Sequence, residues 1–397
     1  MLTMMMKSLT CVLLLSCAVT IWYIILLVFN KEVTSPFVHP SLDKLAINAN
    51  DSGWDATKLM DLENFEYIID AKCALKSKHF KQLPNGQEMK AVWVVTSYAG
   101  DVTKRSALRN AYTDEELRQL GIRRIFLLGT LNDGAQRKSG VTQLAIQNEA
   151  ERFQDIIQGN FIEAYKNLTY KHLMGLQWAV DRCSNTHLYI MKMDDDIIVN
   201  IYEAMALLEN KSSANARGDF LMGYAMNNMA PIRIRESKWF VTYEEFRGST
   251  YPSFLSGWFY VLDMLTAMKL VFQSRQHAKY FWIDDLFITG ILREEAGVGQ
   301  LVDISEYFTS DYRFLKCCLK TQETLTKYKC DFIVGPDGGD RYLLSKFQKF
   351  SKECHYQQCN TRPKLQLLKD KCILDDRKLD LGNGNVQVDK MIVNSVF

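Results

Sequence analysis

The sequence predicts an α/β protein with a mostly parallel β-sheet, helices on both faces, and a single N-terminal membrane-spanning helix. Strand-like and helix-like segments alternate between residues 89 and 200, which is typical of a parallel sheet with crossover helices. One strand runs into three consecutive aspartates, Asp194 to Asp196. An uncharged apolar run lies at residues 9–29, and its length is about what a helix needs to cross a bilayer.

The apolar run at residues 9–29 favours an uncleaved signal anchor over a cleaved signal peptide. A cleaved peptide usually has a shorter apolar core followed by small residues, whereas Asn30 and Lys31 follow this run. Lys7 precedes it, and positive charge tends to stay on the cytoplasmic side. We therefore expect a cytoplasmic tail at residues 1–8, an anchor in the lipid bilayer, and a lumenal remainder.

Composition bounds the remaining chain. The formal net charge of +2 over 397 residues gives no reason to expect nucleic acid as a partner, and 47% hydrophobic residues is ordinary for a globular protein. Apolar periodicity is poor in residues 30–88, which are predicted to form a stem with short helices around Lys58 to Tyr67. A folded domain is expected at residues 89–310, followed by a cysteine-rich extension at residues 311–397.

The folded domain is predicted to bring polar residues to one edge of its sheet. Ligands in such sheets bind beyond the carboxyl ends of the strands. Ser97 and the aspartates both follow strands, so we expect them to share one cleft. The predicted elements are a strand at 91–97, a helix at 105–120, a strand at 123–129, helices at 143–155 and 168–183, and a strand at 187–193.

The three aspartates are candidates for a metal site. Adjacent carboxylates repel one another, so burying them without a cation is costly. Apolar residues on both sides of the cluster predict that it is buried. Hard oxygen ligands suit magnesium or manganese, and such a metal can neutralise a diphosphate leaving group. A solvated acidic turn is the alternative interpretation.

Cysteines and sequons agree with a lumenal location. Eight cysteines lie outside the apolar run, and six of them follow residue 310. An even number in an oxidising lumen predicts disulfides, whose pairing the sequence leaves open. A zinc site is the alternative, but no Cys-x-x-Cys pair occurs and only His355 lies close by. Asn-x-Ser/Thr sequons for N-glycosylation occur at Asn50, Asn167 and Asn210.

Seven blocks of sequence resemble one known family. The blocks are Val94 to Ser97 with Lys104 to Tyr112, Phe126 to Gly129, Glu149 to Lys171, Trp178 with Cys183, Lys192 to Asp196, Tyr251 to Leu262, and Trp282 to Gly290. In this order they resemble glycosyltransferase family 31, the Golgi β-1,3-galactosyltransferase and β-1,3-N-acetylglucosaminyltransferase group. Glu163 stands where that family mostly has Asp, and Asp284 stands where it has Glu.

The resemblance covers about residues 90–300 and implies a function. It implies a GT-A-like catalytic domain in the Golgi lumen that transfers galactose from UDP-galactose to a glycan acceptor on a glycoprotein or glycolipid. It implies a β-1,3 linkage, inversion, and Mn²⁺ held by Asp196 and Asp194. It also implies an acceptor or donor pocket at Gly257, Trp258 and Asp284. The resemblance does not place the late histidine that often completes the family's metal site, and His355 is a weak candidate for it.

Sugar transfer requires a base for the attacking hydroxyl as well as a cation for the departing diphosphate. Asp285 is the predicted base, because it lies among aromatic and apolar residues that raise the pKa of a carboxylate. In the alternative interpretation, Asp284 and Asp285 cap a helix that runs from Leu286 to Glu295.

Six residues are predicted to bind the nucleotide sugar: Ser97, Arg105, Arg109, Lys171, Asp194 and Asp195. The two arginines lie four residues apart on one helical face, which suits either phosphate binding or ion pairs on the helix surface. In the second case Glu115 and Glu116 would be their partners. Lys171 and Lys192 are open to the same two interpretations.

Three other functions fit parts of the sequence. A β-1,3-N-acetylglucosaminyltransferase would use the same residues, since nothing in the chain discriminates the donor's 2-substituent. An inactive transferase-like glycan-binding protein would not need both Asp196 and Asp285. An aspartate-cluster phosphohydrolase needs a nucleophilic aspartate directly after the first strand, where this chain has Thr96 and Ser97.

Overall fold

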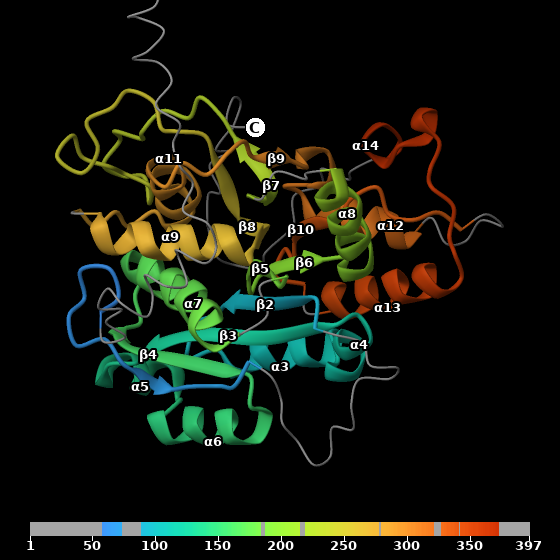
Figure 1. Cartoon of the computed structure of the whole chain (residues 1–397). Coiled ribbons are helices and arrows are strands. Elements are labelled where there is room, and N and C mark those ends of the chain that lie inside the picture. Colours follow the sequence, from blue (N-terminus) through green and yellow to red (C-terminus); the bar gives the residue numbers. More distant parts are fainter. Residues whose placement is uncertain are drawn as a thin grey trace, which may run out of the picture. The chain divides into compact units, whose positions relative to one another are not determined.

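The computed structural model describes residues 58–73, 89–183, 187–214, 219–277, 279–320, 327–340 and 342–372. An eight-stranded sheet in the order β1-β4-β3-β2-β5-β8-β7-β9 organises them (Figure 1). Its strands are β1 (Tyr67–Ile69), β2 (Ala91–Thr96), β3 (Ile122–Thr130), β4 (Ile156–Ile162), β5 (Tyr189–Asp194), β7 (Leu221–Met226), β8 (Phe254–Asp263) and β9 (Val302–Asp303). A two-stranded sheet pairs β6 (Ile197–Val199) with β10 (Val334–Pro336).

The helices surround these sheets in chain order. The α-helices are α3 (Val102–Ala111), α4 (Asp114–Gln119), α5 (Asp133–Ser139), α6 (Gln143–Phe153), α7 (Leu168–Arg182), α8 (Ile201–Ala214), α9 (Met264–Gln276), α10 (Asp284–Leu286), α11 (Arg293–Glu295), α12 (Tyr312–Lys320), α13 (Leu343–Tyr356) and α14 (Leu368–Lys371). Shorter or wider helical turns are η2 (Tyr165–Asn167), the π-helix η3 (Phe287–Leu292), η4 (Ser305–Tyr307) and η6 (Lys364–Gln366).

The predicted α/β class is confirmed, but the sheet is mixed. The four strands β4-β3-β2-β5 are parallel. Beyond them, β8 runs antiparallel to both β5 and β7, and β1 runs antiparallel to β4 at the other edge. The pairing of β8 with β5 therefore places an antiparallel strand beside the aspartate cluster. The alternation of strands and helices in the sequence does not predict this antiparallel strand.

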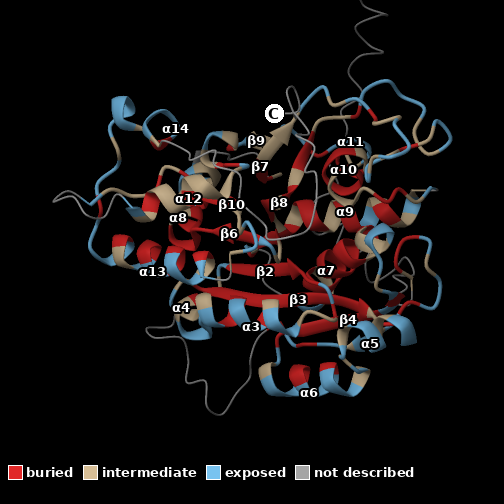
Figure 2. Cartoon of the chain, turned by 180° about the vertical axis from the view of Figure 1, so that it is seen from behind, coloured by how far each residue is buried: buried red, intermediate tan, exposed pale blue. Residues whose placement is uncertain are grey.

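Helices cover both faces of the parallel strands (Figures 1 and 2). Every residue of β2 is buried, as expected for a strand that is covered on both faces. Trp93 belongs to the main core cluster together with Ile146 of α6. On the other face, a Cβ at Gly175 of α7 would lie only 2.6 Å from Leu127 Cδ1, so this glycine lets α7 pack closely against β3.

One predicted helix is broken into two. The sequence predicts a helix over residues 105–120, whereas α3 ends at Ala111 and α4 begins at Asp114. Thr113 starts the second helix, because its side chain accepts a hydrogen bond from Glu116 N. Tyr112 lies between the helices and is buried, and its hydroxyl exchanges hydrogen bonds with the backbone of Val199.

Residues 58–73, which the sequence assigns to the stem, pack against the folded domain. Strand β1 extends the main sheet, Trp178 Nε1 donates to Ala71 O at 2.8 Å, and Cys73 forms a disulfide with Cys183. No helix forms around residues 58–67, where Leu59 and Leu62 instead make a β-bridge.

The tail, the anchor and the rest of the predicted stem lie outside the described residues. Within the described ranges, no helix has the length and apolar character that a membrane span requires.

The described residues after 310 are built onto the same unit, and residues 373–397 lie outside the described part of the chain. Strand β10 pairs with β6, and Ile198 of β6 belongs to the core cluster of the C-terminal region. Gln348 of α13 donates to the Tyr112 hydroxyl at 2.7 Å. The expected boundary at residue 310 therefore does not divide the fold.

The predicted disulfides after residue 310 are confirmed. All six cysteines of this region pair with one another, which leaves no thiolate among them for the alternative zinc site. The pairs are Cys317–Cys372, Cys318–Cys330 and Cys354–Cys359.

Candidate active site

A cavity of about 520 Å³ opens at the carboxyl ends of β2 and β5. These strands are parallel neighbours, with Thr96 opposite Asp194, so the residues that follow them meet at one sheet edge. The expected shared cleft of Ser97 and the aspartates is therefore present. The cavity is lined by Thr96, Ser97, Tyr98, Glu163, Ala164, Tyr165, Leu168, Lys171, Asp194, Asp195 and Asp196.

The aspartate cluster is held by two lysines. Lys192, which is fully buried, places Nζ 2.6 Å from Asp194 Oδ1. Lys104 Nζ lies 3.4 Å from Asp195 Oδ1. Asp196 is exposed, and its backbone oxygen accepts a hydrogen bond from Asp337 N at 2.9 Å. Burial raises the pKa of Asp194, although Lys192 acts in the opposite direction.

Three polar oxygens at the cavity lack hydrogen-bond partners within the part of the chain that the structure describes. They are Thr96 Oγ1, Ser97 Oγ and Asp195 Oδ2, and all three are buried. Buried polar atoms are normally satisfied, so three neighbouring exceptions at a cavity indicate a place for a polar ligand. Their positions at the ends of β2 and β5 match the predicted nucleotide-sugar site.

The carboxylate oxygens at the cavity fit a metal ion whose coordination is completed by a bound substrate. Among the described residues, no three His, Cys, Asp or Glu side chains form a ready-made metal site. Magnesium-like ions are commonly bound by one or two carboxylates and completed by substrate phosphates and water. The exposed Asp196 carboxylate at the cavity suits that arrangement. Asp337, which follows β10, is a carboxylate that the sequence analysis missed, and the β6–β10 pairing brings its backbone to Asp196.

A second group of carboxylates is joined to the aspartate cluster through Lys192. Lys192 Nζ donates to Gly257 O and lies 3.9 Å from Asp284 Oδ2. Asp285 Oδ2 accepts from Gly257 N at 2.9 Å. A Cβ at Gly257 would lie 3.1 Å from Lys192 Nζ and 3.2 Å from Asp285 Cβ, so glycine permits this close approach.

The two carboxylates of this second group differ in their pKa values. Burial, and then the neighbouring charge of Asp284, raise the pKa of Asp285 to about 6. Burial acts in the same direction on Asp284, but Lys192 and the hydrogen bond from His172 hold its pKa below the usual value. A pair of acids with separated pKa values is typical of sites that perform acid–base chemistry.

Asp285 does not cap a helix in the way that the alternative interpretation requires. The helical segment formed by α10, η3 and α11 begins after Ile283, which makes no side-chain capping bond. Asp285 Oδ1 instead accepts from the next residue, Leu286 N, at 2.8 Å. Both carboxylate oxygens thus receive backbone N–H groups, which fix the orientation of the carboxylate.

A buried histidine, His172, contacts Asp284 through a hydrogen bond. His172 Nδ1 lies 3.0 Å from Asp284 Oδ2, and Nε2 contacts the Tyr260 hydroxyl. Burial lowers the pKa of His172, so we assign a neutral ring that donates to Asp284 and accepts from Tyr260. The sequence analysis missed this residue, because a histidine within an apolar helix gives no signal of its partners.

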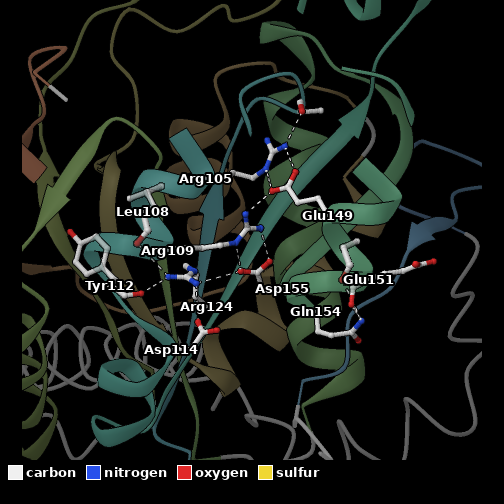
Figure 3. A network of polar contacts seen from close by, with 12 residues as sticks. Arg105, Leu108, Arg109, Tyr112, Asp114, Arg124, Glu149, Glu151, Gln154 and Asp155 are labelled. Carbon is white, nitrogen blue, oxygen red and sulfur yellow. Dashed lines mark hydrogen bonds and ion pairs between the residues drawn. The ribbon is translucent and has the colours of Figure 1, made fainter. Parts of the chain in front are cut away.

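Arg105 and Arg109 are not among the residues that line the cavity and instead belong to a buried network of ion pairs (Figure 3). Arg105 Nη2 lies 2.7 Å from Glu149 Oε2, and Arg109 bridges Glu149 and Asp155 at 2.7 and 2.8 Å. Arg124 approaches Asp155 at 3.4 Å. Both guanidiniums thus make the ion pairs of the alternative interpretation, but their partners are Glu149 and Asp155 and not Glu115 and Glu116.

The cavity loop is instead held through its backbone by buried cations. Arg105 donates to Tyr98 O at 2.8 Å and to Ala99 O at 3.1 Å, and Lys171 donates to Ser97 O at 2.7 Å. Lys171 also pairs with Glu163. Three successive carbonyls of the loop after β2 thus each face a buried cation, which rigidifies the cavity wall.

Glu163 completes this wall from the other side. Its Oε2 accepts from Gly129 N at 2.9 Å and from Ala99 N at 3.3 Å. The residue therefore joins the ends of β2, β3 and β4, which explains why a carboxylate is needed at this position.

The remaining predicted residues lie elsewhere. Trp258 is partly buried and packs against the main core cluster. His355 is exposed and stacks on Tyr202, with ring centroids 4.6 Å apart. Asn167 donates from its side chain to Ile162 O, Asn210 is exposed on α8, and Asn50 lies outside the described residues.

We expect Glu149→Gln to destabilise the protein by roughly 3–5 kcal/mol, because breaking a buried ion pair leaves its partners uncompensated. Arg105 and Arg109 would lose the shared carboxylate that both contact. Glu209→Gln is the matched control, since its pair with Lys90 is exposed and should contribute about 1 kcal/mol or less. Thermal or urea unfolding measures both, and equal stability of the two variants would contradict the expectation.

Comparison with known proteins identifies relatives of this chain. The family model described as Galactosyltransferase matches residues 103–302. Beta-1,3-galactosyltransferase 2 of Mus musculus is 30% identical over 304 residues, which cover 76% of this chain and 67% of that protein. The Homo sapiens counterpart is 29% identical over 270 residues, covering 67% of this chain and 59% of its own length.

Two further similarities are weaker or shorter. Beta-1,3-galactosyltransferase 1 of Mus musculus is 30% identical over 239 residues, covering 60% of this chain and 68% of that protein. Among solved structures, the apo form of the bifunctional glycosyltransferase WbbM covers 70% of this chain and 53% of its own, with a TM-score of 0.33 and 10% identity. A likeness at that level supports no inference about this chain.

Proposed function

Because the chain belongs to the galactosyltransferase family, we propose that it transfers galactose from UDP-galactose to a glycan acceptor in β-1,3 linkage, with inversion. The arrangement of the two acidic groups carries the proposal. The aspartate cluster lies at the cavity of about 520 Å³, and Lys192 connects it to a second carboxylate group that contains Asp285.

In the proposed reaction Asp285 acts as the base. The acceptor hydroxyl oxygen attacks the anomeric carbon of the donor while its proton passes to the Asp285 carboxylate. The bond between the anomeric carbon and the diphosphate oxygen breaks, and its electron pair leaves on UDP. One displacement from the opposite face inverts the anomeric centre. A pKa raised to about 6 suits a base that works near neutral pH.

The aspartate cluster serves the leaving group. When bound, Mn²⁺ would neutralise negative charge on the departing diphosphate, and Asp196 and Asp194 are the residues proposed to hold it. Lys104, which is partly exposed beside Asp195, adds positive charge at the same edge. The unsatisfied oxygens of Thr96, Ser97 and Asp195 would receive polar groups of the nucleotide.

A donor screen tests the proposal. Full-length protein in detergent with Mn²⁺ is incubated with UDP-galactose, UDP-N-acetylglucosamine or UDP-N-acetylgalactosamine and a panel of glycan acceptors. Transfer from UDP-galactose is the expected result. Transfer only from UDP-N-acetylglucosamine would replace the donor and keep the mechanism, whereas glycan binding without any turnover would favour the inactive transferase-like alternative.

We also propose that the protein is a type II Golgi membrane protein with its catalytic domain in the lumen. The support is the uncharged run at residues 9–29 and the four disulfides of the folded part, which form in oxidising compartments. In sealed microsomes the C-terminus should resist protease until detergent is added. Its digestion without detergent would contradict the proposed topology.

A further inference from the structure

Aromatic side chains from two other segments contact Tyr165, which lines the cavity. Tyr165 of η2 lines the cavity and is 51% exposed. Trp239, in the segment between β7 and β8, is hydrogen-bonded to Tyr165 and is 42% exposed. Trp282, directly before α10, is buried and places its ring centroid 6.0 Å from that of Tyr165, so it supports the exposed Tyr165 ring from below the surface. We call these three residues the aromatic platform.

The platform lies beside the carboxylates of the site. Asp284, Asp285 and Asp194 all contribute to raising the pKa of Tyr165, after burial and against the hydrogen bond with Trp239. Trp282 precedes Asp284 by two residues in the chain. A ligand on the platform would therefore lie beside the cavity that Tyr165 and Asp194 line.

The segment that carries Trp239 is held by contacts that do not involve the Trp239 side chain. Arg233 donates to Val241 O and Phe246 O at 2.7 Å each, and Val241 N donates to Ile232 O at 2.9 Å. These backbone contacts hold the segment in place. The exposed part of the Trp239 ring takes no part in these contacts. Large aromatic side chains that stay exposed beside a cavity commonly mark binding sites.

We propose that the aromatic platform binds the terminal sugar of the acceptor glycan. The inference rests on the proposed function and adds the site and chemistry of the acceptor. A pyranose ring has an apolar C–H face and a rim of hydroxyls, and an aromatic side chain offers an apolar ring surface with a polar tip. Packing the C–H face on Trp239 and Tyr165 would leave the hydroxyls free to approach Asp285.

The polar surroundings favour a saccharide over an apolar protein partner. Lys238 Nζ lies 4.2 Å from the Trp239 ring centroid, and Lys166 Nζ lies 5.6 Å from that of Trp282. The neighbouring Arg235 and Glu236 are exposed. A small aromatic surface that is bordered by charged side chains matches a polyhydroxylated ligand, which needs both ring contact and hydrogen bonds.

Kinetics of full-length protein with three variants test the platform. Trp239→Ala should raise the acceptor KM roughly ten-fold, as expected when one aromatic anchor is lost. Trp239→Phe, which retains a ring, should show a smaller rise. Tyr342→Ala is the matched control, because Tyr342 is also an exposed aromatic residue, at 71%, and lies outside the cavity lining. In the control Tyr342→Ala the acceptor KM, the donor KM and the hydrolysis of UDP-sugar without acceptor should stay unchanged. In Trp239→Ala the rise in acceptor KM should clearly exceed any change in donor KM.

A binding measurement separates this inference from the proposed function. Saturation-transfer NMR with methyl β-galactoside and methyl β-N-acetylglucosaminide, in the presence of UDP, should show binding by wild type and its loss in Trp239→Ala. Such binding without transfer from any UDP-sugar would support the platform and refute the transferase. Transfer with the same acceptor KM in Trp239→Ala and Tyr342→Ala would overturn the platform alone. Equal loss of donor hydrolysis and transfer would overturn it too, since Trp239 would then act on the donor.

Discussion

Asp285→Asn should lower kcat by roughly 10²–10⁴-fold, the range expected when a general base is removed. The amide keeps the shape of the side chain but cannot accept the proton of the acceptor hydroxyl. Binding of UDP and of metal should survive, because the aspartate cluster at the ends of β2 and β5 is unchanged. Initial rates with saturating substrates and calorimetric titration of UDP with Mn²⁺ measure the two effects.

The structure also provides a control for the backbone contacts of Asp285. An amide has one acceptor oxygen, so Asp285→Asn loses one of the hydrogen bonds from Gly257 N and Leu286 N. Thr289→Val removes a comparable tie nearby, since Thr289 Oγ1 donates to Asp285 O at 2.7 Å and accepts from Leu255 N at 2.8 Å. This control should lower the melting temperature and largely spare kcat. Similar kcat values for the two variants would refute the base assignment.

The pH profile gives a second readout of the same prediction. A base must be deprotonated to act, and burial with the charge of Asp284 raises the pKa of Asp285 to about 6. Activity of wild type should therefore be lost as the pH falls through about 6 and should be retained above it. The residual activity of Asp285→Asn should lack the step that belongs to Asp285, and any loss at low pH that remains in this variant would belong to Asp194, whose pKa burial raises to about 7.

Asp196→Ala should lower turnover by roughly 10³-fold or more, because metal neutralisation of a leaving diphosphate is worth several kcal/mol. The fold should persist, since Asp196 is exposed and its backbone bond with Asp337 N does not involve the side chain. Asp133→Ala, which removes another exposed carboxylate, should retain activity. Wild-type activity should vanish in excess chelator and return with Mn²⁺, and full activity in chelator would exclude the metal.

The parts of the site that follow from one strand and its end could be predicted from sequence. Apolar residues that lead into Asp194–Asp196 predicted a strand delivering carboxylates to a sheet edge, and β5 ends at Asp194. Ser97 follows the neighbouring strand β2, so the parallel arrangement sufficed to place it in the same cavity. Strand β4 was missed because Gly159 and Asn160 interrupt its apolar pattern.

The sequence by itself determined the α/β class, the carboxylate cluster at the sheet edge and the disulfide-bonded state of the C-terminal region. These features depend on local hydrophobic patterns and on residue type. Only the tertiary structure decided which partners those residues meet. The spacing of Arg105 and Arg109 is the same whether they bind phosphate or form ion pairs, so the sequence does not identify their partners. Their shared partner Glu149 lies 44 residues from Arg105 in the chain. Folding buries both arginines in the protein interior, where each guanidinium requires a carboxylate because an unpaired buried charge is costly.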